Sequence, residues 1–201
     1  MYIIFDTETT GFFNKRDPRL ENQPYIVQFW GIVATVENNK CTEISRIDQL
    51  IKPRVSIPFE ASRIHHIYDV DVKDAPYIED KMDNFLSIMN EVDYFVGHNL
   101  EFDEEMLRIE LRRMGREADY PVKQVLDTMK STVDLCKLEW NGARFKYPKL
   151  WELHKFLFWE YFTWAHNAMM DVEATMRCFE ALLEKNIFLL EKQENKVLSL
   201  F

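Results

Sequence analysis

Five residues in this sequence are of the types that hold divalent cations and move protons. They are Asp6, Glu8, Asp103, His166 and Asp171. Asp6 and Glu8 stand two positions apart at the end of a short apolar run, and side chains two apart on a strand point the same way. Two carboxylates roughly 4 Å apart repel by about 4 kcal/mol at an effective dielectric constant of about 20. A buried pair of this kind usually needs cations nearby, but this pair alone also fits two solvated acids in a turn before Gly11.

The remaining three residues are informative only as a set. Asp103 is expected at the start of a helix, where the helix dipole already favours an acid. Asp171 is expected in the first turns of another helix, with His166 in the loop before it, and each pattern alone also fits solvated groups. If the four carboxylates converge, they form a hard oxygen site for two Mg²⁺ ions. Two ions about 3.5–4 Å apart stabilise both oxygens of a phosphoryl displacement, and a histidine with an ordinary pKa of about 6.5 suits a general base.

The elements that must position these residues follow from hydrophobic periodicity. Strands are predicted at Tyr2–Phe5, Tyr25–Val36, Thr42–Lys52, Tyr94–Gly97 and Val125–Thr128. Helices are predicted at Ile78–Val92, Phe102–Met114, Lys149–Phe158 and Ala168–Leu183, with Gly115 and Asn167 as caps. Three strands followed by alternating helices and strands predict an α/β domain, with a mixed sheet of an antiparallel meander plus parallel strands.

Composition excludes several classes of protein. The chain has 201 residues and a net charge of −9, so it fits one domain and does not coat duplex DNA through phosphate neutralisation alone. Its three cysteines are scattered, which argues against a disulfide framework or zinc knuckle. The first residues lack a basic region, and no apolar run is long enough for a membrane span. We therefore expect a cytoplasmic protein without membrane association.

Three short stretches carry a resemblance to a known family. They are Phe5-Asp-Thr-Glu-Thr-Thr-Gly11, Val96-Gly-His-Asn-Leu-Glu-Phe-Asp103 and Ala165-His-Asn-Ala-Met-Met-Asp171. In this order they resemble the three motifs of the DEDDh, or DnaQ-like, 3′→5′ exonucleases, in particular the proofreading type. The resemblance covers nearly all of residues 1–186, and the histidine five positions before Asp171 indicates the DEDDh branch.

The resemblance implies a ribonuclease-H-like fold, with helices flanking the mixed sheet, and a two-metal active site. By family position, Asp6, Glu8, Asp103 and Asp171 would hold two Mg²⁺ ions, for which Mn²⁺ is expected to substitute, and His166 would be the general base. The implied reaction releases nucleoside 5′-monophosphates from single-stranded or frayed DNA, in proofreading or repair. The alternatives are RNA 3′-end trimming and, in another class, a non-catalytic module that recruits a polymerase or clamp.

The same resemblance suggests contacts to the terminal nucleotide of a single-stranded 3′ end. The expected substrate-binding residues are Thr7, Thr9, Thr10, Phe12, Asn99 and Phe102. Phe13 is expected to pack under its loop and His98 to be structural. His66 departs from the family, because many relatives have glycine at that position.

A basic stretch with aromatic neighbours leaves two interpretations open. Arg144, Lys146 and Lys149 alternate with Phe145 and Tyr147. Such a loop beside an acidic site could guide the backbone of a nucleic-acid strand. It could equally be a solvated loop.

The C-terminal segment suggests a partner. We expect an exonuclease domain at residues 1–186 and a tail at 187–201. Val197-Leu-Ser-Leu-Phe201 resembles the peptide with which bacterial replication proteins bind the sliding clamp, although Val197 replaces the usual glutamine. The alternative is a hydrophobic end that packs on its own domain. A DNA polymerase is a further expected partner.

Overall fold

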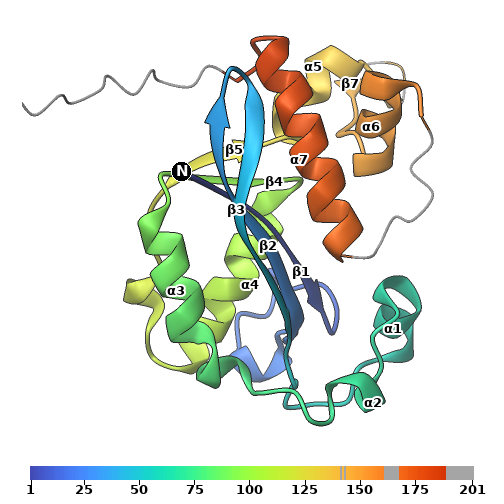
Figure 1. The fold of residues 1–201 in the computed structure, drawn as a ribbon. Coiled ribbons are helices and arrows are strands. Elements are labelled where there is room, and N and C mark those ends of the chain that lie inside the picture. The colour runs from blue at the N-terminus through green and yellow to red at the C-terminus, as the bar shows by residue number, and fades with distance from the viewer. Residues whose placement is uncertain (141, 143, 161–167, 189–201) are drawn as a thin grey trace, which may run out of the picture.

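A single mixed sheet organises the computed structural model, which describes residues 1–140, 142, 144–160 and 168–188 (Figure 1). The strands are β1 (Tyr2–Thr9), β2 (Ile26–Glu37), β3 (Lys40–Leu50), β4 (Tyr94–Gly97) and β5 (Gln124–Asp127). Their order is β3-β2-β1-β4-β5. The first three strands pair antiparallel, whereas β1, β4 and β5 pair parallel. The meander and the parallel strands thus meet at β1, in the middle of the sheet.

Helices cover both faces of this sheet (Figure 1). On one face lie α3 (Met82–Glu91) and α4 (Leu100–Arg113), and on the other α6 (Leu150–Phe158) and α7 (Ala168–Glu184). Two short helices, α1 (Phe59–His65) and α2 (Asp69–Val72), lie beyond the N-terminal end of α7. The smaller elements are α5 (Val133–Cys136), a hairpin of β6 (Glu139–Trp140) and β7 (Arg144–Phe145), and 3-10 turns at Leu20–Asn22, Ile78–Asp80, Glu117–Asp119 and Lys130–Thr132.

The alternation of β1 divides the core into two layers. Ile3 and Phe5 pack with α3 and α4, whereas Tyr2 and Ile4 pack with α6 and α7. Because side chains alternate along a strand, Asp6 and Glu8 continue the row that faces α7. The strand also continues to Thr9 rather than ending before Asp6, because residues 6–9 stay paired with β2.

Long helices were predicted better than short ones. The predicted helix at Ile78–Val92 is a 3-10 turn followed by α3, and α4 begins two residues before the predicted Phe102. Gly115 ends α4 with a φ of 69°, the left-handed conformation that glycine favours. The helices α1, α2 and α5 were missed, since elements of four to seven residues show too few turns for a period. Within the described residues, the helices are too short or too polar to cross a bilayer.

Candidate active site

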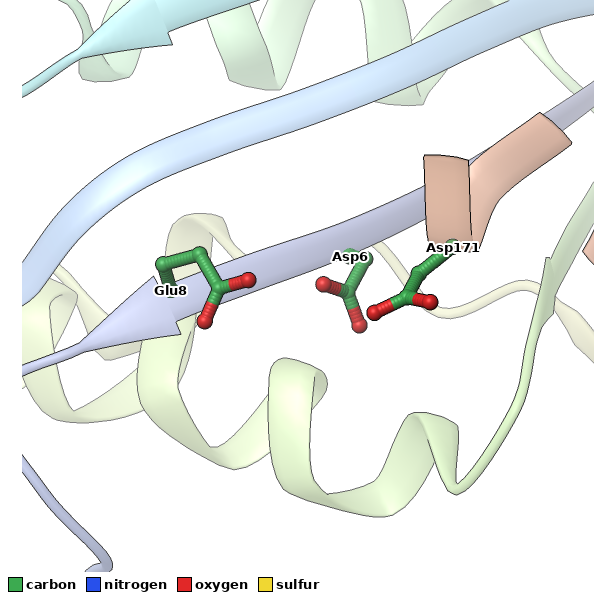
Figure 2. A group of neighbouring side chains, drawn as sticks. All are labelled: Asp6, Glu8 and Asp171. Carbon is green, nitrogen blue, oxygen red and sulfur yellow. The ribbon is translucent and has the colours of Figure 1, made fainter. Parts of the chain in front are cut away.

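Three of the predicted metal ligands converge between β1 and the start of α7. Asp6, Glu8 and Asp171 each place a carboxylate oxygen within 4.8 Å of the other two. Figure 2 shows Asp6 and Glu8 on the same side of β1, with Asp171 approaching from α7. All three side chains are half-buried. Residues 165 positions apart in the sequence therefore form one acidic cluster.

Asp103, the fourth predicted ligand, lies beside this cluster in the first turn of α4. Thr7 donates two hydrogen bonds to its Oδ1, from the backbone N at 2.8 Å and from Oγ1 at 2.7 Å. Gly97 allows β4 to turn into this helix, since a Cβ there would lie 2.5 Å from a Leu100 side-chain carbon. Asp103 is only 3% exposed, and its charge reaches Asp6 and Glu8.

The electrostatics of these carboxylates disfavour the charged form when no cation is present. The pKa of Asp6 is well above its usual value because of burial and then of the charges of Asp103, Glu8 and Asp171. Burial, followed by the charges of Asp171 and Asp103, raises the pKa of Glu8 to about 8. Burial also raises the pKa of Asp103 to about 7, against the lowering effect of the Thr7 hydrogen bonds. Positive charge at this point would reverse all three shifts.

A further carboxylate, Asp127 at the end of β5, builds the scaffold under Asp103. It is 6% exposed and accepts hydrogen bonds of 2.9–3.2 Å from the backbone N–H groups of Asn99, Leu100, Met129 and Lys130. Asn99 has a left-handed backbone with a φ of 70°. Asp127 thus satisfies the N–H groups at the start of α4 and fixes the turn that presents Asp103.

The acidic cluster opens into a cleft of about 690 Å³. Its lining includes all six predicted substrate-binding residues, namely Thr7, Thr9, Thr10, Phe12, Asn99 and Phe102. Phe12 is 84% exposed, and its ring lies edge-on to Phe102 with 5.9 Å between centroids. Phe13 instead stacks on Phe102 at 5.5 Å and is partly buried against the core. Phe12 is therefore the better placed of the two to meet a base.

The threonine hydroxyls are already engaged within the protein. Thr7 donates to Asp103, and Thr9 donates to the carbonyl of Gly11 at 2.7 Å. The Thr10 hydroxyl accepts a hydrogen bond of 2.9 Å from the backbone N–H of Tyr25. All three are buried. The hydroxyls of Thr7 and Thr9 hold the floor of the cleft in shape.

His98 has a structural place, as the sequence predicted. Its Nδ1 lies 3.0 Å from the Thr128 hydroxyl, and its Nε2 lies 3.0 Å from the carbonyl of Pro148. Because a carbonyl only accepts, Nε2 carries the hydrogen. Burial lowers the pKa of this imidazole, which favours the neutral ring between its two partners.

Two walls of the cleft lie outside the set of substrate-binding residues predicted from the sequence. One is α1 with the residue before it, through Pro58, Ala61, Ile64 and His65, and the other is the segment at residues 147–151. Of the basic stretch, Lys149 lines the cleft, whereas Arg144 and Lys146 do not, and Lys146 pairs with Glu152. No periodic signal marks a seven-residue helix, and only the basic stretch hinted at the second wall.

His66 ends α1 with a φ of 61°, in the left-handed region where glycine is favoured.

Three sequence predictions fall outside the described residues. They concern His166, the cap at Asn167 and the peptide Val197–Phe201. The general base and the clamp peptide therefore stay predictions.

The fold and site together define a class of protein. The sheet order and the helices on both faces match a ribonuclease-H-like fold. The family model described as Exonuclease matches residues 3–179. The chain belongs to this exonuclease family.

The individual relatives are larger proteins. The chain is 30% identical over 184 residues to the 3′-5′ exonuclease DinG of Bacillus subtilis (strain 168), covering 92% of this chain and 18% of that protein. It is 34% identical over 148 residues to the DNA polymerase III subunit epsilon of Rickettsia conorii (strain ATCC VR-613 / Malish 7), covering 74% and 59%. The chain thus spans less than two thirds of these relatives.

Solved structures share the fold. The nuclease domain of 3′hExo, a DEDDh family member bound to rAMP, superposes with a TM-score of 0.71 at 16% identity, covering 94% of each chain. The zinc-bound E. coli ExoI–ssDNA complex superposes with a TM-score of 0.72 at 19% identity, covering 93% of this chain and 42% of that one. At these identities the likeness concerns the fold.

Proposed function

We propose that this chain is a metal-dependent 3′→5′ exonuclease that removes nucleotides from single-stranded or frayed DNA, in proofreading or repair. The observation that carries the proposal is the convergence of Asp6, Glu8 and Asp171 in a cleft, with Asp103 buried beside them. DNA is preferred over RNA because the named relatives include the 3′-5′ exonuclease DinG and a DNA polymerase III subunit epsilon.

The carboxylates fit a pair of divalent cations, proposed as Mg²⁺ with Mn²⁺ as a substitute. Their oxygens are hard donors, and in the part of the chain that the structure describes no hydrogen-bond donor reaches Asp6 or Glu8. Asp6, Glu8, Asp103 and Asp171 would hold the cations. When bound, the cations would stabilise charge on the attacking and leaving oxygens.

The protein's own residues would move the proton and hold the strand end. His166 would take a proton from the attacking water. The water oxygen bonds to the terminal phosphorus, and the bond from phosphorus to the 3′ oxygen of the preceding nucleotide breaks. The products are a nucleoside 5′-monophosphate and a strand that is shorter by one nucleotide. Phe12 would stack on a base at the cleft, beside Asn99 and Phe102.

Digestion of 3′-labelled DNA and RNA oligonucleotides, side by side, tests this activity. Mononucleotides should appear with Mg²⁺ or Mn²⁺, not with a chelator, and faster from DNA. Asp6→Ala and His166→Ala should abolish their release, and variants as fast as wild type would contradict the assigned roles. Faster release from RNA would point to RNA 3′-end trimming. If pure wild-type protein releases no mononucleotides from either substrate, the remaining alternative is a non-catalytic module that recruits a polymerase or clamp.

We also propose that residues 1–186 form the exonuclease domain and that the tail at 187–201 contacts a bacterial sliding clamp through Val197–Phe201. The clamp would keep the domain near a DNA polymerase. A peptide of residues 191–201 should bind the clamp in a direct titration. Lack of binding at high micromolar peptide would contradict this contact.

A further inference from the structure

One wall of the cleft combines two aromatic rings with a cation. Tyr147, Lys149 and Trp151 all line the cleft that contains Asp6 and Asp171. They are spaced two apart where the chain runs from β7 into α6, and Lys149 has an extended backbone with a ψ of 158°. Side chains two apart in an extended segment point the same way. Tyr147 and Lys149 therefore point the same way in the segment before α6, whereas Trp151 reaches the same wall from the first turn of α6.

The aromatic surfaces of this wall are available to a ligand. Tyr147 is 56% exposed and Trp151 is 37% exposed. One exposed aromatic residue on a surface needs no explanation, but these two line the same cleft as the half-buried carboxylate cluster. Aromatic platforms with a neighbouring cation are the usual means of binding single-stranded nucleic acid without reading its sequence.

The charge of Lys149 is also available. Neighbouring lysines are neutralised, because Lys130 pairs with Glu101 at 2.7 Å and Lys146 pairs with Glu152. Among the described residues, by contrast, no carboxylate pairs with the exposed Lys149. It is thus a cation at the cleft that is free to meet a phosphate.

The wall is held in place before any ligand arrives. The carbonyl of buried Pro148 accepts a hydrogen bond from His98 at 3.0 Å. The backbone N of Lys146 donates to Leu138 at 2.8 Å, and the backbone N of Lys149 donates to Glu152 at 2.8 Å. His98 thereby ties the wall to the turn that carries Asn99 and Asp103. Preorganisation of this kind lowers the ordering cost of binding.

We propose that Tyr147, Lys149 and Trp151 form a second nucleotide subsite, which holds the strand on the 5′ side of the terminal nucleotide, with His98 as its positioning residue. The rings would stack on bases and Lys149 would contact a phosphate. The inference rests on the proposed exonuclease function. It concerns the part of the substrate strand that the metal ligands do not contact. It implies a preference for unpaired strands, because stacked and paired bases are not free to meet the rings.

Two substrates separate this subsite from the catalytic centre. The p-nitrophenyl ester of thymidine 5′-monophosphate carries one nucleotide, whereas a short oligo-dT extends along the cleft. The double variant Tyr147→Ala/Trp151→Ala should raise KM for oligo-dT by about tenfold or more and leave hydrolysis of the ester unchanged. Lys149→Ala should lower the salt dependence of oligo-dT binding by about 0.7 in log–log slope.

Matched controls come from residues outside the cleft. Phe145→Ala removes an aromatic side chain that is 42% exposed and outside the cleft, and Lys185→Ala removes an exposed lysine past the C-terminal end of α7. Equal KM values for the double variant and Phe145→Ala would overturn the subsite. Circular dichroism checks that each variant is folded. The single variant Trp151→Phe, which keeps an aromatic ring, should retain most of the oligo-dT affinity that the double variant loses.

Failure of the proposed function gives a different pattern. If wild-type protein cleaves neither substrate, the exonuclease assignment fails, and anisotropy of labelled oligo-dT still tests the subsite. Weaker binding by the double variant but not by Phe145→Ala would support it. Equal binding by both would overturn it.

Discussion

Two groups of carboxylates near the cleft differ in their hydrogen-bond donors. At the start of α4, Asp127 accepts from the four backbone N–H groups of Asn99, Leu100, Met129 and Lys130. At the end of β1, Asp6 and Glu8 receive no such donors from the described residues, and their pKa values are raised. Asp103 lies between the two regions, with donors from Thr7 and a pKa of about 7.

The difference separates structural acids from acids that await a cation. A carboxylate surrounded by N–H donors keeps its charge at little cost and stabilises the fold. Carboxylates that face each other without donors destabilise the fold until a cation arrives. The number of donors therefore indicates the role of each acid better than burial does, since Asp103 and Asp127 are both buried.

The largest expected effect is on activity. Asp6→Asn removes one charge from the cluster, so catalysis should fall by about a thousandfold or more. Without metal, the free energy of unfolding should stay the same or rise, because repulsion is removed. Oligonucleotide digestion and urea denaturation measure the two quantities, and a destabilised apo protein would place Asp6 among the structural acids.

The reverse pattern is expected for the structural region. Asp127→Ala leaves several N–H groups at the start of α4 without an acceptor, so the free energy of unfolding should fall by about 3 kcal/mol. Addition of Mg²⁺ should not restore the lost free energy of unfolding. Denaturation with and without Mg²⁺ tests this expectation, and wild-type stability would show that the cap contributes little.

A smaller effect should appear in the dependence of stability on pH. The pKa of Glu8 is raised from 4.5 to about 8 in the folded state, so the folded protein binds more protons than the unfolded chain between these values. Apo stability should therefore fall as pH rises from about 5 to about 8, with a loss in Tm of about 5 °C. Mg²⁺ should raise Tm more at the higher pH, and Glu8→Gln should flatten the apo profile. A Tm that rises over this range would contradict the assignment.

The smallest effect concerns strain outside both regions. His66 ends α1 in the left-handed conformation, with a φ of 61°. His66→Gly should raise the free energy of unfolding by about 0.5–1 kcal/mol, after the entropy cost of glycine. Activity should not change, because His66 is absent from the cleft lining. Thermal melts and digestion assays check both, and a stability loss would mean that the imidazole makes a needed contact.

Much of the fold could be predicted because its signals are local. The alternation in β1 and the long periods of α4 and α7 lie within one element, as does the position of Gly115 after α4. The three motifs likewise identify Asp6, Glu8, Asp103 and Asp171 as a set. Local sterics and side-chain spacing determine the elements, whereas the four acids were identified as a set from the resemblance to a family.

The sequence by itself therefore determined the sheet strands, the long helices, the acidic residues and the family. Only the tertiary structure decided which acids meet, since pairing of β1 with β2 and β4 and packing of α7 bring residues 6, 8 and 171 within 4.8 Å. It also decided that Thr7 serves Asp103 and that Lys149, rather than Arg144 or Lys146, reaches the cleft. These outcomes depend on contacts between segments far apart in the chain, and no local period encodes such contacts.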